Sequence, residues 1–162
     1  MLLTNSTLAE NRAIAFGSGS GGGIGGSGAV LIQNTIIARN SAGATGQDCS
    51  GTVTSLGNNL IGDLSGCTIT LQPSDLTGDP GLDTFTDNGK PGNGHFPLLS
   101  TSQAIDAGNN AVCPRRDQLG KRRVGPCDIG SIAFRNKDDR GHEEEDDHQR
   151  EDDPVAAAEG SR

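Results

Sequence analysis

The stretch LIQNTIIARN, at residues 31–40, closely repeats LLTNSTLAEN, at residues 2–11. A third, weaker copy, SLGNNLIGD, occupies residues 55–63. When the copies are aligned on Asn5, Asn34 and Asn58, they recur at intervals of 29 and 24 residues. Repeats of this length are typical of proteins in which each copy is one structural unit stacked on the next.

Each copy has one apolar residue two positions before its Asn and another three positions after it. These are Leu3, Ile32 and Leu56 before the Asn, and Leu8, Ile37 and Ile61 after it. Residues on one face of a strand are an even number apart, but these two are five apart. We therefore expect each copy to be two short strands joined by a corner at or beside the Asn.

Stacking of the copies would place Asn5, Asn34 and Asn58 above one another, as a ladder in which the side-chain amides bond along the stack. The simpler alternative is that these Asn residues only mark turns. Between the first two copies lies GSGSGGGIGGSGAV, residues 17–30, which has the composition of a flexible linker. Because Ile24 lies where a stacked coil needs its remaining wall, we expect part of this stretch to form a third short strand.

Composition agrees with a repetitive fold. Only 31% of the residues are apolar, 25 are Gly, and the aromatic residues are four Phe with no Trp or Tyr, which is little for an ordinary globular core. Residues 1–134 hold ten acidic and eight basic side chains, whereas residues 135–162 hold eleven and five. That acidic tail has almost no large apolar residue, so the sequence predicts that it is disordered.

The four cysteines fall into two local pairs, Cys49 with Cys67 and Cys113 with Cys127. No CxxC spacing or accompanying histidine pattern indicates a zinc site, so we expect disulfides and an oxidising compartment. The sequence alone leaves three connectivities open.

Four stretches of the sequence resemble known proteins, two of them a superfamily and the other two a domain family. The stretches TNSTLAENRA (residues 4–13) and GGGIGGSGAVLIQNTIIARNSA (residues 21–42) resemble coils of bacterial right-handed parallel β-helix proteins of the pectin-lyase-like superfamily. GDPGLDTFTDNGKPGNGHFPLLSTSQAIDAGNN (residues 78–110) and CPRRDQLGKRRVGPCDIGSIAF (residues 113–134) resemble the C-terminal signature of the choice-of-anchor Q domain family. The resemblance covers roughly residues 1–134, and its succession AIDAG, DQLG and CDIG is more specific than the coil motifs.

The repeats and the resemblance together predict an all-β, right-handed parallel β-helix, a solenoid of about three coils. The expected divisions are coils over residues 1–72, a disulfide-tied C-terminal cap over residues 73–134, and the disordered tail over residues 135–162. Family members usually have more coils upstream and an anchoring element downstream. We therefore expect a C-terminal fragment of a longer exported chain, with the upstream coils as a partner.

No signal peptide is recognisable at residues 1–13, and no stretch is long and apolar enough to span a membrane. The expected location is extracellular or at the cell surface, associated with an outer membrane. The superfamily includes lyases, hydrolases and proteins without catalytic activity, and the fold does not choose among them.

Catalytic residues cannot be assigned from the sequence. Glycosidic hydrolysis generally needs two carboxylates across the sugar, but most acids outside the tail lie in turn contexts such as GDP, TDNG and IDAG, where Asp bonds nearby backbone amides. His95 has no partner at a recognisable spacing. Asp106, Asp117 and Asp128 are weak candidates for a calcium site, with structural turns as the alternative; no other cofactor is expected.

Five basic residues lie between Cys113 and Cys127: Arg115, Arg116, Lys121, Arg122 and Arg123. Such a loop could attract polyanions, but the scarcity of aromatic residues argues against specific nucleic-acid binding. The expected partner is a polysaccharide or a cell-surface glycan. The leading hypothesis is a non-catalytic exported or surface protein with an adhesive or structural role. The alternative is a polysaccharide lyase or glycoside hydrolase whose active site lies on upstream coils.

Overall fold

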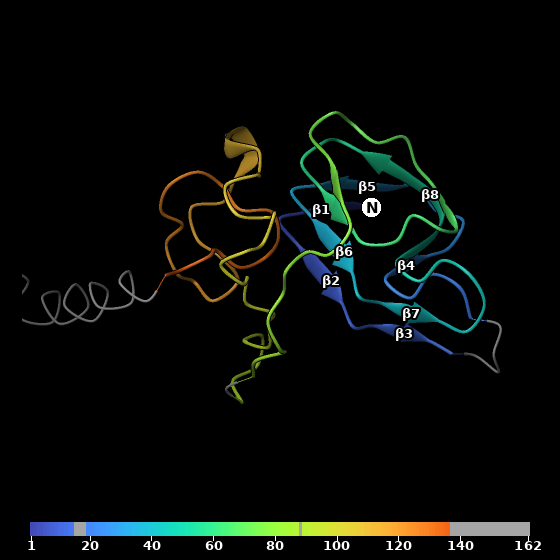
Figure 1. Ribbon diagram of the computed structural model, residues 1–162, viewed down its shortest axis with the longest axis horizontal. Coiled ribbons are helices and arrows are strands. Elements are labelled where there is room, and N and C mark those ends of the chain that lie inside the picture. The colour runs from blue at the N-terminus through green and yellow to red at the C-terminus, as the bar shows by residue number, and fades with distance from the viewer. Residues whose placement is uncertain (15–18, 88, 137–162) are drawn as a thin grey trace, which may run out of the picture.

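The computed structural model describes residues 1–14, 19–87 and 89–136 (Figure 1). The predicted acidic tail therefore lies outside the described residues, except for Arg135 and Asn136. The described residues form short strands and one 3-10 helix, η2 (Asn110–Val112). The strands are β1 (Leu2–Thr4), β2 (Thr7–Ala9), β3 (Arg12–Ala13), β4 (Ile24–Gly25), β5 (Val30–Gln33), β6 (Ile36–Ala38), β7 (Ser41–Ala42), β8 (Cys49–Ser55), β9 (Leu60–Ile61), β10 (Cys67–Thr68) and β11 (Leu76–Thr77).

These strands pair only in parallel, in three sheets. The first sheet has the order β1-β5-β8-β10 with β4 also on β8, the second has the order β11-β9-β6-β2, and the third pairs β3 with β7. The chain runs from the first sheet into the second and returns to the first one layer later, so the sheets are built from strands of successive layers. The predicted all-β class with parallel strands is confirmed.

Backbone geometry marks the corners that the repeats predict. Asn5, Asn34 and Asn58 have φ angles of 42°, 49° and 57°, in the left-handed region, and each lies between a strand of the first sheet and a strand of the second. Asn is one of the few residues that tolerates this conformation. Glu10 and Arg39, five residues further on, repeat the left-handed conformation at φ of 58° and 62°. Each of the first two layers therefore turns twice at equivalent positions.

The register of the third layer differs from the alignment by one residue before its corner. Leu2 lies opposite Leu31, as the 29-residue interval predicts, but Ile32 lies opposite Ser55 and not opposite Leu56. Leu56, which the alignment matches with Leu3 and Ile32, is 43% exposed and does not take their place in the sheet. Beyond the corner the 24-residue interval holds, with Ile36 opposite Leu60. Gly57, with φ of 98°, precedes Asn58 and accommodates the extra residue at this corner.

A fourth layer follows that the repeats do not predict. β10 pairs with β8 and β11 with β9, so that Leu76 lies opposite Leu60, 16 residues away. The stack therefore extends to Thr77, into the segment expected to begin the cap. The glycine-rich stretch contributes β4, which pairs with β8 where a third short strand is expected.

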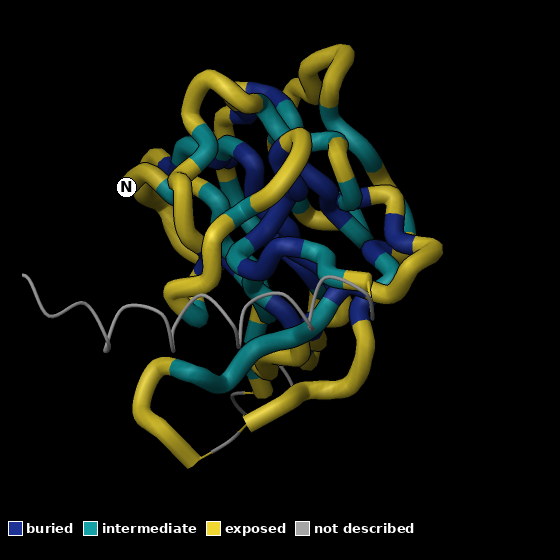
Figure 2. The backbone as a smooth tube through the Cα atoms, turned by 90° about the vertical axis from the view of Figure 1, so that its left-hand side faces the viewer, coloured by how far each residue is buried: buried dark blue, intermediate teal, exposed yellow. Residues whose placement is uncertain are grey.

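The second sheet separates two apolar cores. Along β6, Ile37 faces inward to the core between the first two sheets, whereas Ile36 and Ala38 face outward, and all three side chains are fully buried. A strand buried on both faces needs a continuous apolar run, as in TIIA. Figure 2 shows the buried backbone gathered at the centre of the molecule and the exposed backbone in the outer loops.

The C-terminal segment, residues 79–136, lies alongside the second sheet (Figure 1). It bonds each of the first three layers: Asn5 Nδ2 to Cys127 Sγ at 3.5 Å, Asn34 Nδ2 to the Asn109 carbonyl at 3.1 Å, and Asn58 Nδ2 to the Ala107 carbonyl at 2.9 Å. Most of the segment expected as the C-terminal cap therefore packs along the side of the stack, against the second sheet. The physical reason is that the outward side chains of the second sheet are apolar and must be covered.

In the part of the chain that the structure describes, no helix is long and apolar enough to cross a membrane.

Candidate functional site

The predicted asparagine ladder runs across two layers. Asn34 donates from Nδ2 to Asn5 Oδ1 at 3.4 Å, and its own Oδ1 accepts from the Asn109 backbone N–H at 2.7 Å. Asn58 occupies the equivalent corner but donates to Ala107 in the C-terminal segment. These three amides therefore connect the corners to the C-terminal segment as much as to one another.

A second ladder lies at the other corner of the first two layers. Asn40 Oδ1 accepts from both the backbone N–H and Nδ2 of Asn11, at 3.0 and 2.9 Å, while Asn40 Nδ2 donates to Asp48 Oδ1 at 2.8 Å. Asp48 is 2% exposed and also accepts from the backbone N–H groups of Asn40 and Asp63. The signal for this ladder was in the sequence, because each of the first two copies ends in Asn six residues after its first Asn.

The third layer has its own polar brace. Asn59 is fully buried, and its Oδ1 accepts from the Thr35 backbone N–H at 3.1 Å. Asp75 Oδ1 accepts from Asn59 Nδ2 at 3.0 Å, and Asp75 Oδ2 accepts from the Ser55 hydroxyl at 2.6 Å. Buried polar groups that are satisfied in this way fix one register.

Both cysteine pairs form disulfides, and together they contain all four cysteines. Cys49–Cys67 joins β8 to β10, and therefore the third layer to the fourth. Cys113–Cys127 closes the loop that carries the basic residues.

Of the three aspartates in the AIDAG, DQLG and CDIG motifs, Asp117 and Asp128 brace the backbone. Asp128 accepts from the backbone N–H groups of Asp106 and Phe134 at 2.8 and 2.7 Å. Asp117 Oδ1 accepts from the backbone N–H groups of Leu119 and Lys121, both at 3.0 Å. Within residues 1–14, 19–87 and 89–136, no group of three or more acidic, His or Cys side chains could hold a metal ion. Asp117 and Asp128 instead hold backbone turns, the structural role that the sequence offers as the alternative to a calcium site.

Burial shifts two pKa values in this region. Desolvation raises the pKa of Asp128, against the opposing effects of the two backbone hydrogen bonds and of Arg123. Desolvation also lowers the pKa of Arg123, against the attraction of Asp128 and Asp117. The two groups therefore form a partly buried charged unit inside the C-terminal segment.

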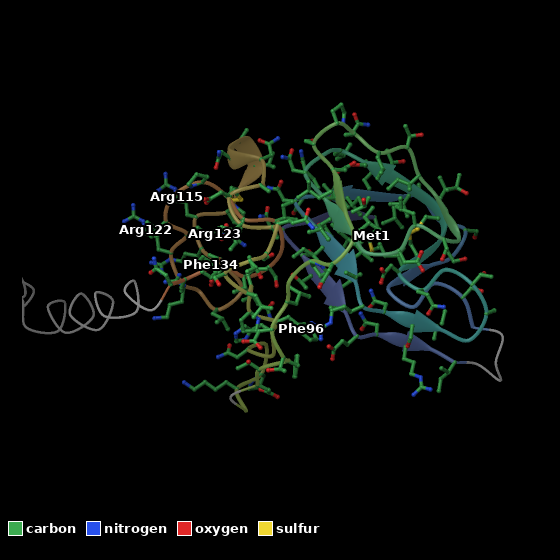
Figure 3. The ribbon with its side chains drawn as sticks, viewed as in Figure 1. Met1, Phe96, Arg115, Arg122, Arg123 and Phe134 are labelled. Carbon is green, nitrogen blue, oxygen red and sulfur yellow. A yellow bond between two sulfur atoms is a disulfide. The ribbon has the colours of Figure 1, made fainter. Side chains whose placement is uncertain are left out.

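The five basic residues divide into two sets. Arg115, Arg116, Lys121 and Arg122 are exposed, and Figure 3 places Arg115 and Arg122 at the outer edge of the loop. Arg123 lies nearer the body of the molecule and donates from Nη2 to the Gly130 carbonyl at 2.8 Å and from Nη1 to the Asp128 carbonyl at 3.4 Å. Arg123 therefore differs from the other four basic residues, because its guanidinium also holds the segment from Asp128 to Gly130.

His95 and Arg135 make contacts that the sequence does not indicate. His95 pairs with Thr86 through two backbone hydrogen bonds, of 2.8 and 3.0 Å, and its Nδ1 lies 2.7 Å from the Asn93 carbonyl. Arg135, assigned to the tail by sequence, donates to the Arg122 carbonyl at 2.7 Å and lies 3.9 Å from Asp117 Oδ2. The folded segment therefore extends at least to Arg135.

Comparison of the chain with protein-family models, with curated proteins and with solved structures finds no match. Function must therefore be argued from the residues described above.

Proposed function

We propose that this chain is a right-handed parallel β-helix and acts as a non-catalytic extracellular or cell-surface protein with an adhesive or structural role. The β-helix is supported by the return of the chain to each parallel sheet one layer later. The right hand is supported by the strong preference of crossovers between parallel strands in one sheet. The resemblance to the choice-of-anchor Q domain family agrees with both.

The extracellular location is supported by the disulfides. All four cysteines are in disulfides, and stable structural disulfides belong to oxidising compartments. Cys113–Cys127 closes a loop with little regular structure of its own, which fits a protein that must keep its shape outside the cell.

The observation that carries the non-catalytic role is how three buried carboxylates and one half-buried carboxylate, that of Asp75, are used. Asp48, Asp75, Asp117 and Asp128 each accept two or more hydrogen bonds from backbone or amide N–H groups. A general acid or base must present its carboxyl group to a substrate, whereas these groups hold the chain. Such use favours a structural or adhesive protein over a glycosidase.

The test measures cleavage and binding with the same preparations. The chain is incubated with alginate, pectin and heparin, and both reducing-sugar release and unsaturated uronate absorbance are followed, with retention on the immobilised polysaccharides as the second measurement. We expect retention without cleavage. Product formation that persists in purified protein and disappears when Asp128 or His95 is replaced would overturn the proposal in favour of a carbohydrate-active enzyme.

A further inference from the structure

A groove runs along the junction between the first layer and the C-terminal segment. Two hollows of about 450 and 430 Å³ adjoin there and share Thr7, Gln118 and Ser131 in their walls. The groove is distinct from the outer edge of the basic loop, because Arg115 and Arg122 do not line it. Its two ends differ in chemistry.

One end carries guanidinium groups. Arg116 and Arg123 line it together with Asn5, Ser6 and Asp117. Arg116 donates from Nη1 to the Gly120 carbonyl at 2.6 Å, and the other N–H groups of its guanidinium can donate to a ligand. The Nε–H of Arg123 is buried and has no hydrogen-bond partner among the described residues. The charge of Asp117 is offset by Arg135, 3.9 Å away, so this end remains positive.

The other end carries aromatic rings. Phe85, 53% exposed, and Phe96 line it with His95, and the two rings are 5.2 Å apart at an angle of 59°. A Cβ at Gly94 would lie 2.6 Å from the Phe85 ring, so the absence of a side chain there allows the ring its position. An exposed aromatic face is a surface on which the apolar face of a sugar ring can pack.

Gln118 fixes the distance between the two ends. Its Nε2 donates to the carbonyls of Gly92 and Gly94, at 2.9 and 2.8 Å, and so ties the loop of the Phe residues to the disulfide-closed loop of Arg116. The groove is therefore held in shape by contacts that are already made. Such preorganisation lowers the entropic cost of binding.

We infer that this groove binds an acidic oligosaccharide, with a sugar ring against Phe85 and a carboxylate or sulfate at Arg116. Guanidinium pairs with both anions through parallel hydrogen bonds, and the hydroxyl and amide groups of Thr7, Gln118 and Ser131 lie between the ends, where sugar hydroxyls need partners. The inference names a ligand for the adhesive role and rests on the proposed function in that respect.

Isothermal titration calorimetry at about 0.15 M salt, where surface charges are screened beyond about 8 Å, tests the groove. The probes are hexasaccharides of alginate, carrying carboxylates only, a heparin hexasaccharide, carrying sulfates as well, and maltohexaose as the neutral control. Arg116→Ala and Phe85→Ala should each weaken binding about tenfold, which corresponds to about 1.4 kcal/mol. The matched control is Arg115→Ala, which removes the same charge from the same loop outside the groove and should change the affinity less than twofold.

Equal losses in Arg115→Ala and Arg116→Ala would overturn the inference, because binding would then depend on diffuse loop charge. Equal affinity for maltohexaose would overturn the acidic ligand. Sedimentation that shows self-association through the groove, without binding of any hexasaccharide, would overturn it as well. If the chain is retained on immobilised polysaccharide but Arg116→Ala and Phe85→Ala do not change the affinity, the groove is not the binding site, whereas the proposed adhesive function stands. Circular dichroism of each variant establishes that it is folded.

Discussion

The stacked strands of residues 2–77 and the C-terminal segment of residues 79–136 reach a defined structure by different means. The stack uses parallel pairing that repeats in each layer, with polar ladders at its corners. In its described residues, the C-terminal segment has only isolated antiparallel bridges, such as Thr86 with His95, and one 3-10 helix. It is held instead by a disulfide, by carboxylates that accept from the backbone, and by the apolar face of the second sheet. The difference shows that a regular support can position an irregular segment, which then carries the candidate binding groove.

The largest expected effect comes from β6, the strand of the stack whose outward side chains pack against the C-terminal segment. Ile37→Ala empties part of the interior of the stack, and Ile36→Ala empties part of the contact with the C-terminal segment; each should cost about 2–5 kcal/mol. Urea unfolding followed by circular dichroism measures the loss, since the chain has no Trp or Tyr. Hydrogen exchange should rise in residues 79–136 more for Ile36→Ala than for Ile37→Ala.

The control for this pair is Leu2→Ala, at a side chain that is 57% exposed, with an expected loss below about 0.5 kcal/mol. Identical exchange patterns in the two Ile variants would show that the two cores unfold as one unit, and the contrast between the regions would not extend to their stability.

Removal of one disulfide at a time compares the regions directly. The sequence separations of 18 and 14 residues imply a loss of about 3 kcal/mol for each pair of Cys→Ser changes. Replacing Cys113 and Cys127 should release the basic loop while the parallel strands keep their circular dichroism. Replacing Cys49 and Cys67 should instead loosen the fourth layer. A strand signal lost in the first variant and kept in the second would contradict this assignment.

In the ladder of Asn11 and Asn40, replacing the buried residue should destabilise the fold more than replacing the exposed one. Asn40→Ala removes the side-chain donor to Asp48 Oδ1 and the acceptor of the Asn11 amide, and the expected loss is about 1–3 kcal/mol. Asn11→Ala, at the exposed end of the same ladder, should cost less. Thermal melting of the two variants under one condition gives the comparison; a larger loss for Asn11→Ala would contradict the ladder.

The smallest effect is the pH response of the C-terminal segment. Burial raises the pKa of Asp128 in the folded state, so the protonated form is favoured by folding and the stability that it contributes is lost as the pH rises through the folded pKa. Asp128→Asn keeps one acceptor and replaces the other by a donor, with an expected net change of about 1 kcal/mol. The stability of the natural chain relative to Asp128→Asn should fall as the pH is raised from the ordinary carboxyl range. If the difference in stability between the two chains is the same at every pH, burial does not raise the pKa of Asp128.

The all-β class and its parallel layers could be predicted because the repeat is local. Each copy contains its own apolar pair and its own Asn corner, and parallel stacking is the arrangement that buries every copy in the same way. The one-residue difference in register before the third corner, which puts Ser55 and not Leu56 opposite Ile32, could not be predicted. The third copy is weak and aligns equally well with one residue more or less before its corner. The fourth layer was missed for a related reason: its 16-residue return carries no copy of the repeat.

What the sequence by itself determined is the repeating half of the molecule, where neighbouring residues specify strand, corner and interior face. Only the tertiary structure decided where residues 79–136 lie, that Arg123 holds the backbone from Asp128 to Gly130 while Arg116 faces the groove, and that Phe85 lies at the other end of that groove. The physical reason is that these contacts join residues far apart in the chain, and no periodicity in the sequence records which of them meet.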